Sequence, residues 1–241
     1  MIDHRVSIIY RARAGARFDW AYYLERHLPL AVGVSMRHAS ITACDVDRPL
    51  ADIAAPHVCI CVVHFADVAA MDAFRGFFHT GHPESHRILA DEPNYTTIEP
   101  VFVAGAARTV THGGDAPPAP GAFRLRLMFP APAGTQFDHG YFAAIAETVL
   151  RERLLPLVPV LCTQTDGMLS GVAPQSTPAY HAIWSLYLPS RAAVDTCLGL
   201  LHGPAGVAIR ADLGPVTTVA PEILAAEVVA FDLRLAAAAS R

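Results

Sequence analysis

The sequence predicts an α+β protein built from two β-α-β-β-α-β units in tandem. Three observations predict this fold class: a Gly-, Pro- and Ala-rich segment near the middle of the chain, a repeated order of motifs on either side of it, and alternating strand-like and helix-like patterns within each repeat. We expect a first unit at residues 1–110, a linker at 111–121 (THGGDAPPAPG) and a second, diverged unit at 122–241. The linker composition favours an extended spacer because it cannot build a core.

The internal repeat rests on motifs that recur in register. Three segments match at offsets of 119, 123 and 121 residues, and a drift of this size is expected if insertions lie in loops. The matched segments are 18–23 with 137–142, 69–72 with 192–195, and 90–100 with 211–221.

Each unit contains four predicted strands and two predicted helices. Period-2 patterns indicate strands, and apolar residues at helical spacing indicate helices, the first of which begins after Asp19 as N-cap. In the first unit the strands are 5–10, 39–46, 57–65 and 97–103, and the helices are 19–27 and 69–78. In the second the strands are 123–129, 160–166, 180–188 and 216–224, and the helices are 141–155 and 192–201.

This order is the ferredoxin-like plan, in which both helices cover one face of a four-stranded sheet. The other face must be covered as well. We therefore expect the two sheets to pack face to face as an intramolecular pseudo-dimeric α/β barrel with a cavity between them. Fusion in one chain raises the effective concentration of the partner sheet.

Composition excludes several classes of partner. The chain is 53% hydrophobic and 17% charged with a net charge of −4, which predicts a sizeable core and no nucleic-acid or membrane partner. All 18 basic residues are arginine, so a Schiff-base lysine is excluded. The five cysteines lack regular spacing and no apolar run reaches the length of a membrane span, so we expect a cytoplasmic protein without disulfides.

The first unit resembles the EthD family of the dimeric α/β-barrel superfamily over about residues 5–105. The resemblance implies a ferredoxin-like fold and sheet pairing. It implies function only loosely, because the superfamily includes cofactor-free monooxygenases of aromatic polyketides, polyketide cyclases, lactone isomerases and haem-degrading relatives. The residues that carry it are a strand ending in Tyr10, then Phe18-Asp19-x-x-Tyr22-Tyr23-x-x-x-His27-x-Pro29-Leu30, Phe65-Ala66-Asp67, and Ala90-Asp91-x-x-Asn94-Tyr95-Thr96.

His27 is the first candidate catalytic residue. It follows Tyr23 by one helical turn, and Pro29 predicts that the helix ends just beyond it. The helix dipole would then favour the protonated form, giving a general acid or base near neutral pH. The alternative is a histidine packed structurally. The second unit has Ala146 at this position, so we expect one site per chain.

Tyrosines and an aspartate complete the expected site. Tyr22 and Tyr23 are adjacent, so their side chains point about 100° apart on a helix and only one of them can face a cavity. Tyr23 joins His27 as a catalytic candidate that donates to an oxyanion, or else packs in the core. We expect Tyr22, Asp91 and Tyr95 to contact substrate, although Asp91 is also explained as a turn or loop residue, or as one that orients a histidine.

His57 and His64 lie on one predicted strand and differ by an odd number, so alternation places them on opposite faces. Either of them is a candidate second acid or base, and His64 is taken as the third catalytic residue. Cys59 and Cys61 share a face of this strand and are expected to be small buried residues.

Three histidines stand in the segment HTGHPESH, at 79, 82 and 86, with Glu84 among them. Gly81 and Pro83 interrupt any helix here, so the one-face spacing of a zinc motif is absent and we expect no metal. His86 is instead expected to contact substrate at the mouth of the cavity.

These features favour a cofactor-independent acid/base enzyme that acts on a hydrophobic, aromatic or polyketide-like small molecule. The reaction would be a cyclisation, isomerisation, dehydration or oxygenation, and the absence of phosphate-loop, Rossmann and nucleophile-elbow motifs predicts no nucleotide cofactor. One alternative is a non-catalytic carrier of a small ligand. Another is a haem-binding protein with His27 or His64 as axial ligand. Further homo-oligomerisation stays open.

Overall fold

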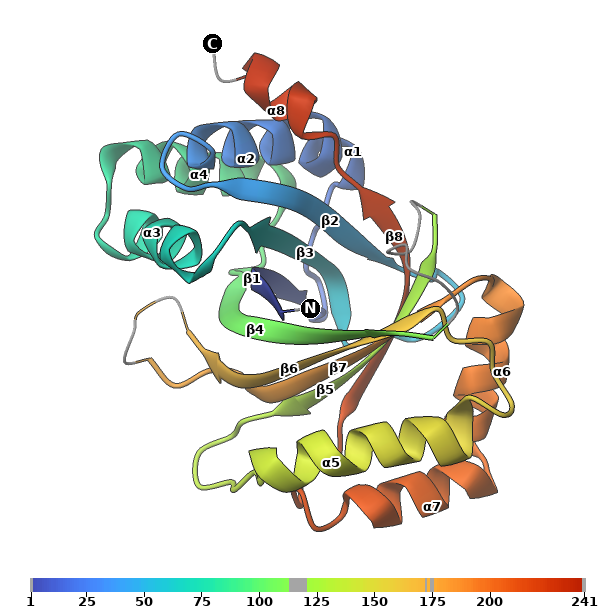
Figure 1. Ribbon diagram of the computed structural model, residues 1–241. Coiled ribbons are helices and arrows are strands. Elements are labelled where there is room, and N and C mark those ends of the chain that lie inside the picture. Colours follow the sequence, from blue (N-terminus) through green and yellow to red (C-terminus); the bar gives the residue numbers. More distant parts are fainter. Residues whose placement is uncertain (1, 113–120, 172, 174–175, 240–241) are drawn as a thin grey trace.

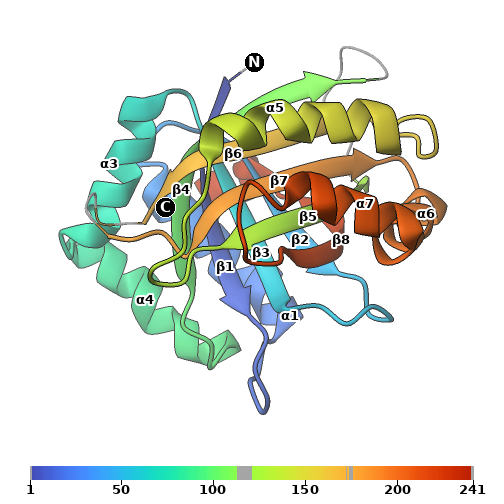
Figure 2. The same ribbon diagram turned by 90° about the horizontal axis from the view of Figure 1, so that it is seen from below.

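The structure, a computed structural model, describes residues 2–112, 121–171, 173 and 176–239. Eight antiparallel strands form one closed barrel, and the helices lie on its outside (Figure 1, Figure 2). The protein is therefore of the predicted α+β class. Most of the predicted linker, residues 113–120, lies outside the described residues.

Both halves of the chain contribute four strands. The elements of the first half are β1 (Ile2–Arg11), α1 (Trp20–Tyr22), the π-helix η1 (Tyr23–His27), α2 (Leu28–Ser35), β2 (Ile41–Pro49), β3 (His57–Phe65), α3 (Val68–His79), α4 (Pro83–Tyr95) and β4 (Val101–Thr111). Those of the second half are β5 (Phe123–Pro130), α5 (His139–Val149), η2 (Leu150–Leu154), β6 (Cys162–Ser170), β7 (Tyr180–Leu188), α6 (Arg191–His202), α7 (Pro204–Leu213), β8 (Glu222–Ala230) and α8 (Leu233–Ala239).

The strand order shows how the barrel closes. The first half contributes β4-β1-β3-β2 and the second half β8-β5-β7-β6. The two sheets are joined at both edges by backbone hydrogen bonds, β2 to β8 and β4 to β6. They are thus continuous with each other, and closure leaves neither sheet with a free edge.

The inside of the barrel is packed with side chains from both halves. Apolar residues such as Ile60, Met128 and Ile183 fill one part of it. Elsewhere in the interior, buried arginines of β1 and β5 pair with aspartates of β2 and β6. Side chains that point into a closed barrel are shielded from water, so a charge there is costly unless it is paired. The ion pairs are Arg5–Asp166, Arg124–Asp45, Arg124–Asp47 and Arg126–Asp47.

Each half also has a core between its sheet and its helices. In the first half η1, α2, α3 and α4 cover the outward side chains of the sheet, and in the second half α5, α6 and α7 do so. The C-terminal α8 crosses over and packs on the first half, where Ala236 is fully buried (Figure 1). These outer layers hold most of the large apolar side chains.

The sequence missed three helices and misplaced two strands. Neither α4 nor α7 was predicted, because both begin with a Gly and Pro combination (Gly81 with Pro83, and Gly203 with Pro204) and Pro93 lies inside α4. The short C-terminal α8 was also missed. Proline at the first position of a helix costs no hydrogen bond, so Pro83 and Pro204 begin α4 and α7. The segments 97–100 and 216–221 are loops, and β4 and β8 start after them.

Within the described residues no single helix is long and apolar enough to cross a membrane. By length and composition alone, α6 and α7 meet that test as a pair bent by 70°. The five cysteines are all buried and free. Cys44 Sγ and Cys61 Sγ approach to 3.6 Å without forming a disulfide.

Candidate active site

The candidate site is a pocket between the outer face of the first sheet and the helices that cover it. Strands β1, β2, β3 and β4 form its floor, and η1, α2, α3 and α4 form its other walls. Most of the lining is apolar, and the polar lining residues are His27, Glu92, Tyr10, Tyr23, Ser35 and Cys61. The expected position between the two sheets is therefore wrong. His27 and the barrel interior lie on opposite faces of the sheet.

A widened helical turn places His27 in this pocket. Leu28 donates its backbone N–H to the Tyr23 carbonyl five residues back, which makes η1 a π-turn. Pro29 follows directly and has no backbone N–H for a helical hydrogen bond, yet the helix continues as α2 to Ser35. The predicted helix end at Pro29 is thus wrong, and His27 lies within the helix, where the C-terminal dipole does not act on it. Such π-turns are frequent at functional sites.

The His27 imidazole belongs to a chain of hydrogen bonds. Its Nδ1 lies 2.9 Å from Asp91 Oδ2, and its Nε2 lies 3.2 Å from the Tyr95 hydroxyl. The Tyr95 hydroxyl is 2.8 Å from the Tyr10 hydroxyl. The chain therefore runs Asp91–His27–Tyr95–Tyr10 from α4 through η1 to β1, and three of its four members are buried.

Asp91 accepts two further hydrogen bonds on its other oxygen. The Tyr22 hydroxyl donates to Asp91 Oδ1 at 2.8 Å, and the Asn94 side-chain amide donates to the same oxygen at 2.9 Å. Asp91 thus orients a histidine, one of the roles considered from the sequence. It lies inside α4, so its interpretation as a turn residue is wrong.

Tyr22 and Tyr23 lie on either side of this chain. As expected for neighbours on a helix, only Tyr23 lines the pocket, and its ring stacks on that of His27 with centroids 5.6 Å apart. Tyr22 is half-buried and stacks on the far side of Tyr95. Both tyrosines hold the site in shape.

The protonation states follow from burial and hydrogen bonding. Burial lowers the pKa of His27 and outweighs the attraction of Asp91, which acts in the opposite direction. Although burial opposes ionisation of Asp91, bonds from Asn94, Tyr22 and His27 lower its pKa. An ionised Asp91 can only accept, so Nδ1 of a neutral His27 donates to it and Nε2 accepts from Tyr95. Burial raises the pKa of Tyr95 and of Tyr10, which keeps both phenols protonated.

Glu92 is a pocket residue that sequence reasoning missed. Its carboxyl forms no hydrogen bond or ion pair within the described part of the chain, and it lines the same cavity as His27. Burial, with a smaller contribution from Glu99, raises the pKa of Glu92 to about 7. No pattern in the sequence distinguishes it from a solvated helix residue. Tyr10 was also left out of the expected site, although it belongs to the EthD-like motif.

The cavity itself is small, with a volume of about 30 Å³. Small-molecule pockets usually measure roughly 300–1,000 Å³. A ligand would therefore enter only if the helices move apart above the sheet.

His64 is not part of this site. Its Nδ1 and Nε2 each lie 2.8 Å from a carboxylate oxygen, of Asp3 and Asp45, on the inner face of the sheet. Burial opposes its protonation, but the two carboxylates prevail and raise the pKa of His64 to about 9. The structure therefore does not bring His64 together with His27 and Tyr23, contrary to what the sequence had led us to expect.

His57 is also on the inner face, contrary to the alternation argument. The register between β1 and β3 shifts so that Tyr10 pairs with Cys59 and Arg11 with His57. This β-bulge places one extra residue on the outer face. His57 Nε2 therefore contacts the Tyr180 hydroxyl at 2.8 Å, inside the barrel.

His86 lies on the exposed side of α4 and does not line the pocket. The expectation that it contacts substrate at the cavity mouth is not supported by this position. Five of the seven expected site residues do come together: Tyr22, Tyr23, His27, Asp91 and Tyr95.

Comparisons with known proteins bear on the fold. No protein-family model matches the sequence, and no curated protein matches it. An anthrone oxidase-like protein of known structure aligns with a TM-score of 0.63 at 13% identity, covering 94% of this chain and 91% of that one. This chain therefore shares its overall fold with that protein.

Two further structures are similar in part. An EthD-like protein from Ralstonia eutropha JMP134 is 29% identical, with coverage of 42% of this chain and 86% of that chain and a TM-score of 0.34. A monooxygenase-like protein from Lactobacillus acidophilus NCFM is 9% identical over 96% of this chain and 99% of that one, with a TM-score of 0.46. The structures similar to this chain thus include an EthD-like protein, as the sequence motif led us to expect.

Proposed function

We propose that this protein is an acid/base enzyme acting on a neutral, hydrophobic small molecule, with His27 as the base. The observation that carries the proposal is a neutral imidazole held between a carboxylate and a tyrosine at the wall of an apolar pocket. No arginine lines the pocket within the described residues, which favours a neutral substrate over an anionic one. An anthrone oxidase-like protein shares the fold, and this agrees with an aromatic or polyketide-like substrate.

The first step is removal of a proton from an activated carbon or a phenol. The bond between His27 Nε2 and Tyr95 is the longest in the chain at 3.2 Å, so a substrate that displaces the Tyr95 hydroxyl gains access to the Nε2 lone pair. Asp91 accepts from Nδ1–H and stabilises the imidazolium that forms. It plays the part that a carboxylate plays behind many catalytic histidines.

The negative charge that develops on the substrate oxygen needs hydrogen-bond donors to stabilise it. Tyr10 lines the pocket, and Tyr95 is hydrogen-bonded to both Tyr10 and His27, so these two residues supply phenolic O–H groups next to the base. Glu92, with its pKa raised to about 7, can return a proton elsewhere on the substrate. Cyclisation, isomerisation and dehydration all use these two proton transfers. Oxygenation without a cofactor would use the first and then react the electron-rich anion with O₂.

The architecture proposed with this function is an internal duplication. We infer two ferredoxin-like units, 1–110 and 122–241, that pair with each other as separate subunits do in a dimeric barrel. The partner is then a small molecule, with no nucleic acid, membrane or cofactor, and one active site per chain.

A non-catalytic carrier is the second candidate. The engagement of both nitrogens of His27 in protein hydrogen bonds favours it. Neither candidate axial ligand fits haem. Both ring nitrogens of His27 are hydrogen-bonded within the protein, and both ring nitrogens of His64 are bonded to Asp3 and Asp45.

Proton abstraction can be tested before the substrate is known. We expect the protein to catalyse exchange of an acidic C–H for deuterium in D₂O in one or more members of a panel of hydrophobic ketones and phenols, followed by NMR. His27→Ala should slow that exchange by about 100-fold or more, the usual contribution of a general base. His86→Ala, an exposed histidine of α4, is the matched control. Binding without exchange would establish the carrier, and exchange that survives His27→Ala would refute the assignment.

The pH profile provides a second readout. The rate should fall at acid pH as His27 becomes protonated, and burial moves this fall to lower pH by lowering the pKa of His27. It should also fall as pH rises through about 7, where Glu92 loses its proton. Glu92→Gln should remove the upper limb and also lower the maximal rate, because an amide cannot return the proton.

A further inference from the structure

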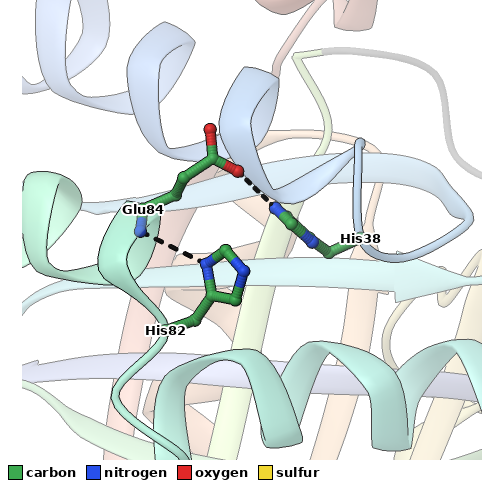
Figure 3. Close-up of side chains that lie close together, drawn as sticks. All are labelled: His38, His82 and Glu84. Carbon is green, nitrogen blue, oxygen red and sulfur yellow. Dashed lines mark hydrogen bonds and ion pairs between the residues drawn. The ribbon is translucent and has the colours of Figure 1, made fainter.

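A second cluster of ligating side chains lies outside the His27 pocket, where the end of α2 meets the start of α4. His38 follows α2, His82 is the N-cap of α4, and Glu84 lies in the first turn of α4 (Figure 3). One ligand atom from each residue lies within 4.8 Å of the other two. We propose that His38, His82 and Glu84 bind a divalent cation of the zinc type.

The donor set fits such an ion. Two imidazole nitrogens and one carboxylate oxygen are the three protein ligands of many zinc sites, with water in the fourth position. His38 Nε2 is already 2.6 Å from Glu84 Oε2, so these two ligand atoms are close enough to bind the same ion. All three side chains are partly exposed, and the small rotations that coordination requires are open to them.

Neighbouring groups hold the donors in place, as outer partners do at metal sites. The His38 ring stacks on Phe77 with centroids 4.5 Å apart, and the His82 ring packs on the same phenyl group at 5.2 Å. Arg37 pairs with Glu84 Oε1 and leaves Oε2 directed at His38. The cluster thus has a rigid apolar wall and an oriented carboxylate.

Coordination has an identifiable cost. His82 Nδ1 accepts the backbone N–H of Glu84 at 3.2 Å and so caps α4. Binding of metal at Nδ1 takes that lone pair, and binding at Nε2 moves the ring proton to Nδ1, so either mode ends the capping bond. A single capping bond is weak compared with a metal–ligand bond.

The position of the cluster gives the ion a role. His38 and His82 belong to segments that continue into α2 and α4, which supply Ser35 and Ile88 to the wall of the His27 pocket. A bound ion would join these two segments at the edge of a cavity that must open to admit a ligand. The metal proposal itself does not depend on the function proposed for His27.

The absence of a metal was expected from the sequence because Gly81 and Pro83 interrupt the histidine-rich segment. The structure supplies the missing ligand from a different part of the chain. His38 was not considered, since nothing near it in the sequence indicates a metal site.

The test uses the full chain freed of metal by chelation and dialysis. Titration with Zn²⁺ against a chromophoric chelator should show one equivalent bound, and Co²⁺ should give the absorption bands of a tetrahedral site. His38→Ala and Glu84→Gln keep the helix cap, and each should weaken binding by more than the roughly 10–100-fold that loss of an outer partner costs. His82→Ala should do the same.

Two histidines of the same segment are matched controls. His79 and His86 are exposed and lie outside the cluster, so His79→Ala and His86→Ala should bind zinc as the parent does. Thermal unfolding without metal shows whether each variant folds. Absence of stoichiometric binding, or binding that His38→Ala leaves unchanged, overturns the proposal.

Discussion

The two halves of this protein share a backbone arrangement but differ at the candidate site. In the first half the Asp19 N–H donates to the Tyr95 carbonyl at 2.7 Å, and in the second the Asp138 N–H donates to the Val216 carbonyl at 3.0 Å. Each aspartate also caps the helix that follows it. Positions can therefore be compared directly between the halves.

At three of the four positions of the hydrogen-bonded chain the second half has apolar side chains, and all three are buried. The corresponding pairs are Tyr10 with Phe129, His27 with Ala146, and Tyr95 with Val216. The fourth residue, Asp91, corresponds to Asp212, which is partly exposed and pairs with Arg153 instead of a histidine. Burying polar groups costs free energy unless each is hydrogen-bonded. The second half shows that this fold closes without them. This comparison favours a role other than folding for the polar chain of the first half.

The largest expected effect comes from making the first half resemble the second. In Tyr10→Phe/His27→Ala/Tyr95→Phe the polar chain is lost while most of the packing volume stays. We expect exchange activity to fall by about 10²–10⁴-fold, the range for loss of a general base. Circular dichroism and urea unfolding should show a folded protein.

The outcome separates two explanations of the polar chain. Retained activity in this triple variant would remove the chain from the mechanism. Failure to fold would instead show that the two halves are not equivalent in what stabilises them.

The second prediction concerns the interior that both halves share. Asp47 of the first half is fully buried and accepts from Arg124 at 2.9 Å and Arg126 at 2.5 Å, both from the second half. Asp47→Ala leaves two arginines short of a counter-charge, so the free energy of unfolding should fall by about 3–5 kcal/mol. Urea denaturation measures it.

Asp52→Asn is the matched control for Asp47→Ala. Asp52 also pairs with an arginine of the second half, Arg191, but the pair lies on the surface. Exposed ion pairs contribute little to the free energy of unfolding, so Asp52→Asn should change it only slightly. If Asp52→Asn destabilises the protein as much as Asp47→Ala, burial is not what makes the interior pairs important.

The sequence was sufficient to predict most strands of the barrel, but it was not sufficient to predict the contacts within the candidate site. Strands 57–65 and 180–188 were predicted at their observed bounds, because continuous apolar and β-branched residues mark a buried strand. His27, Asp91 and Tyr95 were singled out through the EthD-like motif, yet their hydrogen bonds were not foreseen, since α4 was missed. Three-dimensional proximity of 27, 91 and 95 depends on that helix.

Other errors have local physical causes. A β-bulge reversed the expected face of His57, and a π-turn carried the helix past Pro29. Buried charges also escaped the sequence analysis, because the alternation of Arg124 and Arg126 with leucines is that of a half-exposed strand. A closed barrel buries both faces, and only the tertiary fold determines that.

The third prediction uses pH to probe the same interior. The pKa of His64 is raised to about 9 from an unfolded value near 6.5, so the stabilisation is fully present below about pH 6.5 and is lost as pH rises through 9. The loss should be on the order of 2–3 kcal/mol in the free energy of unfolding. His64→Gln should lack this component when the two proteins are compared at pH 6.5 and 9.5. Equal pH dependence in both would show that Asp3 and Asp45 do not hold a protonated imidazole.

The smallest effect tests the equivalence of the halves most closely. Tyr22 and Tyr141 occupy matching positions after matching N-caps, but only Tyr22 donates to a carboxylate of the hydrogen-bonded chain, Asp91, at 2.8 Å. Tyr22→Phe keeps the ring stacked on Tyr95 and removes one of two donors to Asp91 Oδ1, while Asn94 remains. We expect a reduction in exchange rate of about 3–10-fold, below the full value of a charged hydrogen bond because Asn94 compensates in part. Tyr141→Phe should leave the rate unchanged, and equal effects of the two substitutions would mean that the site does not distinguish the first half from the second.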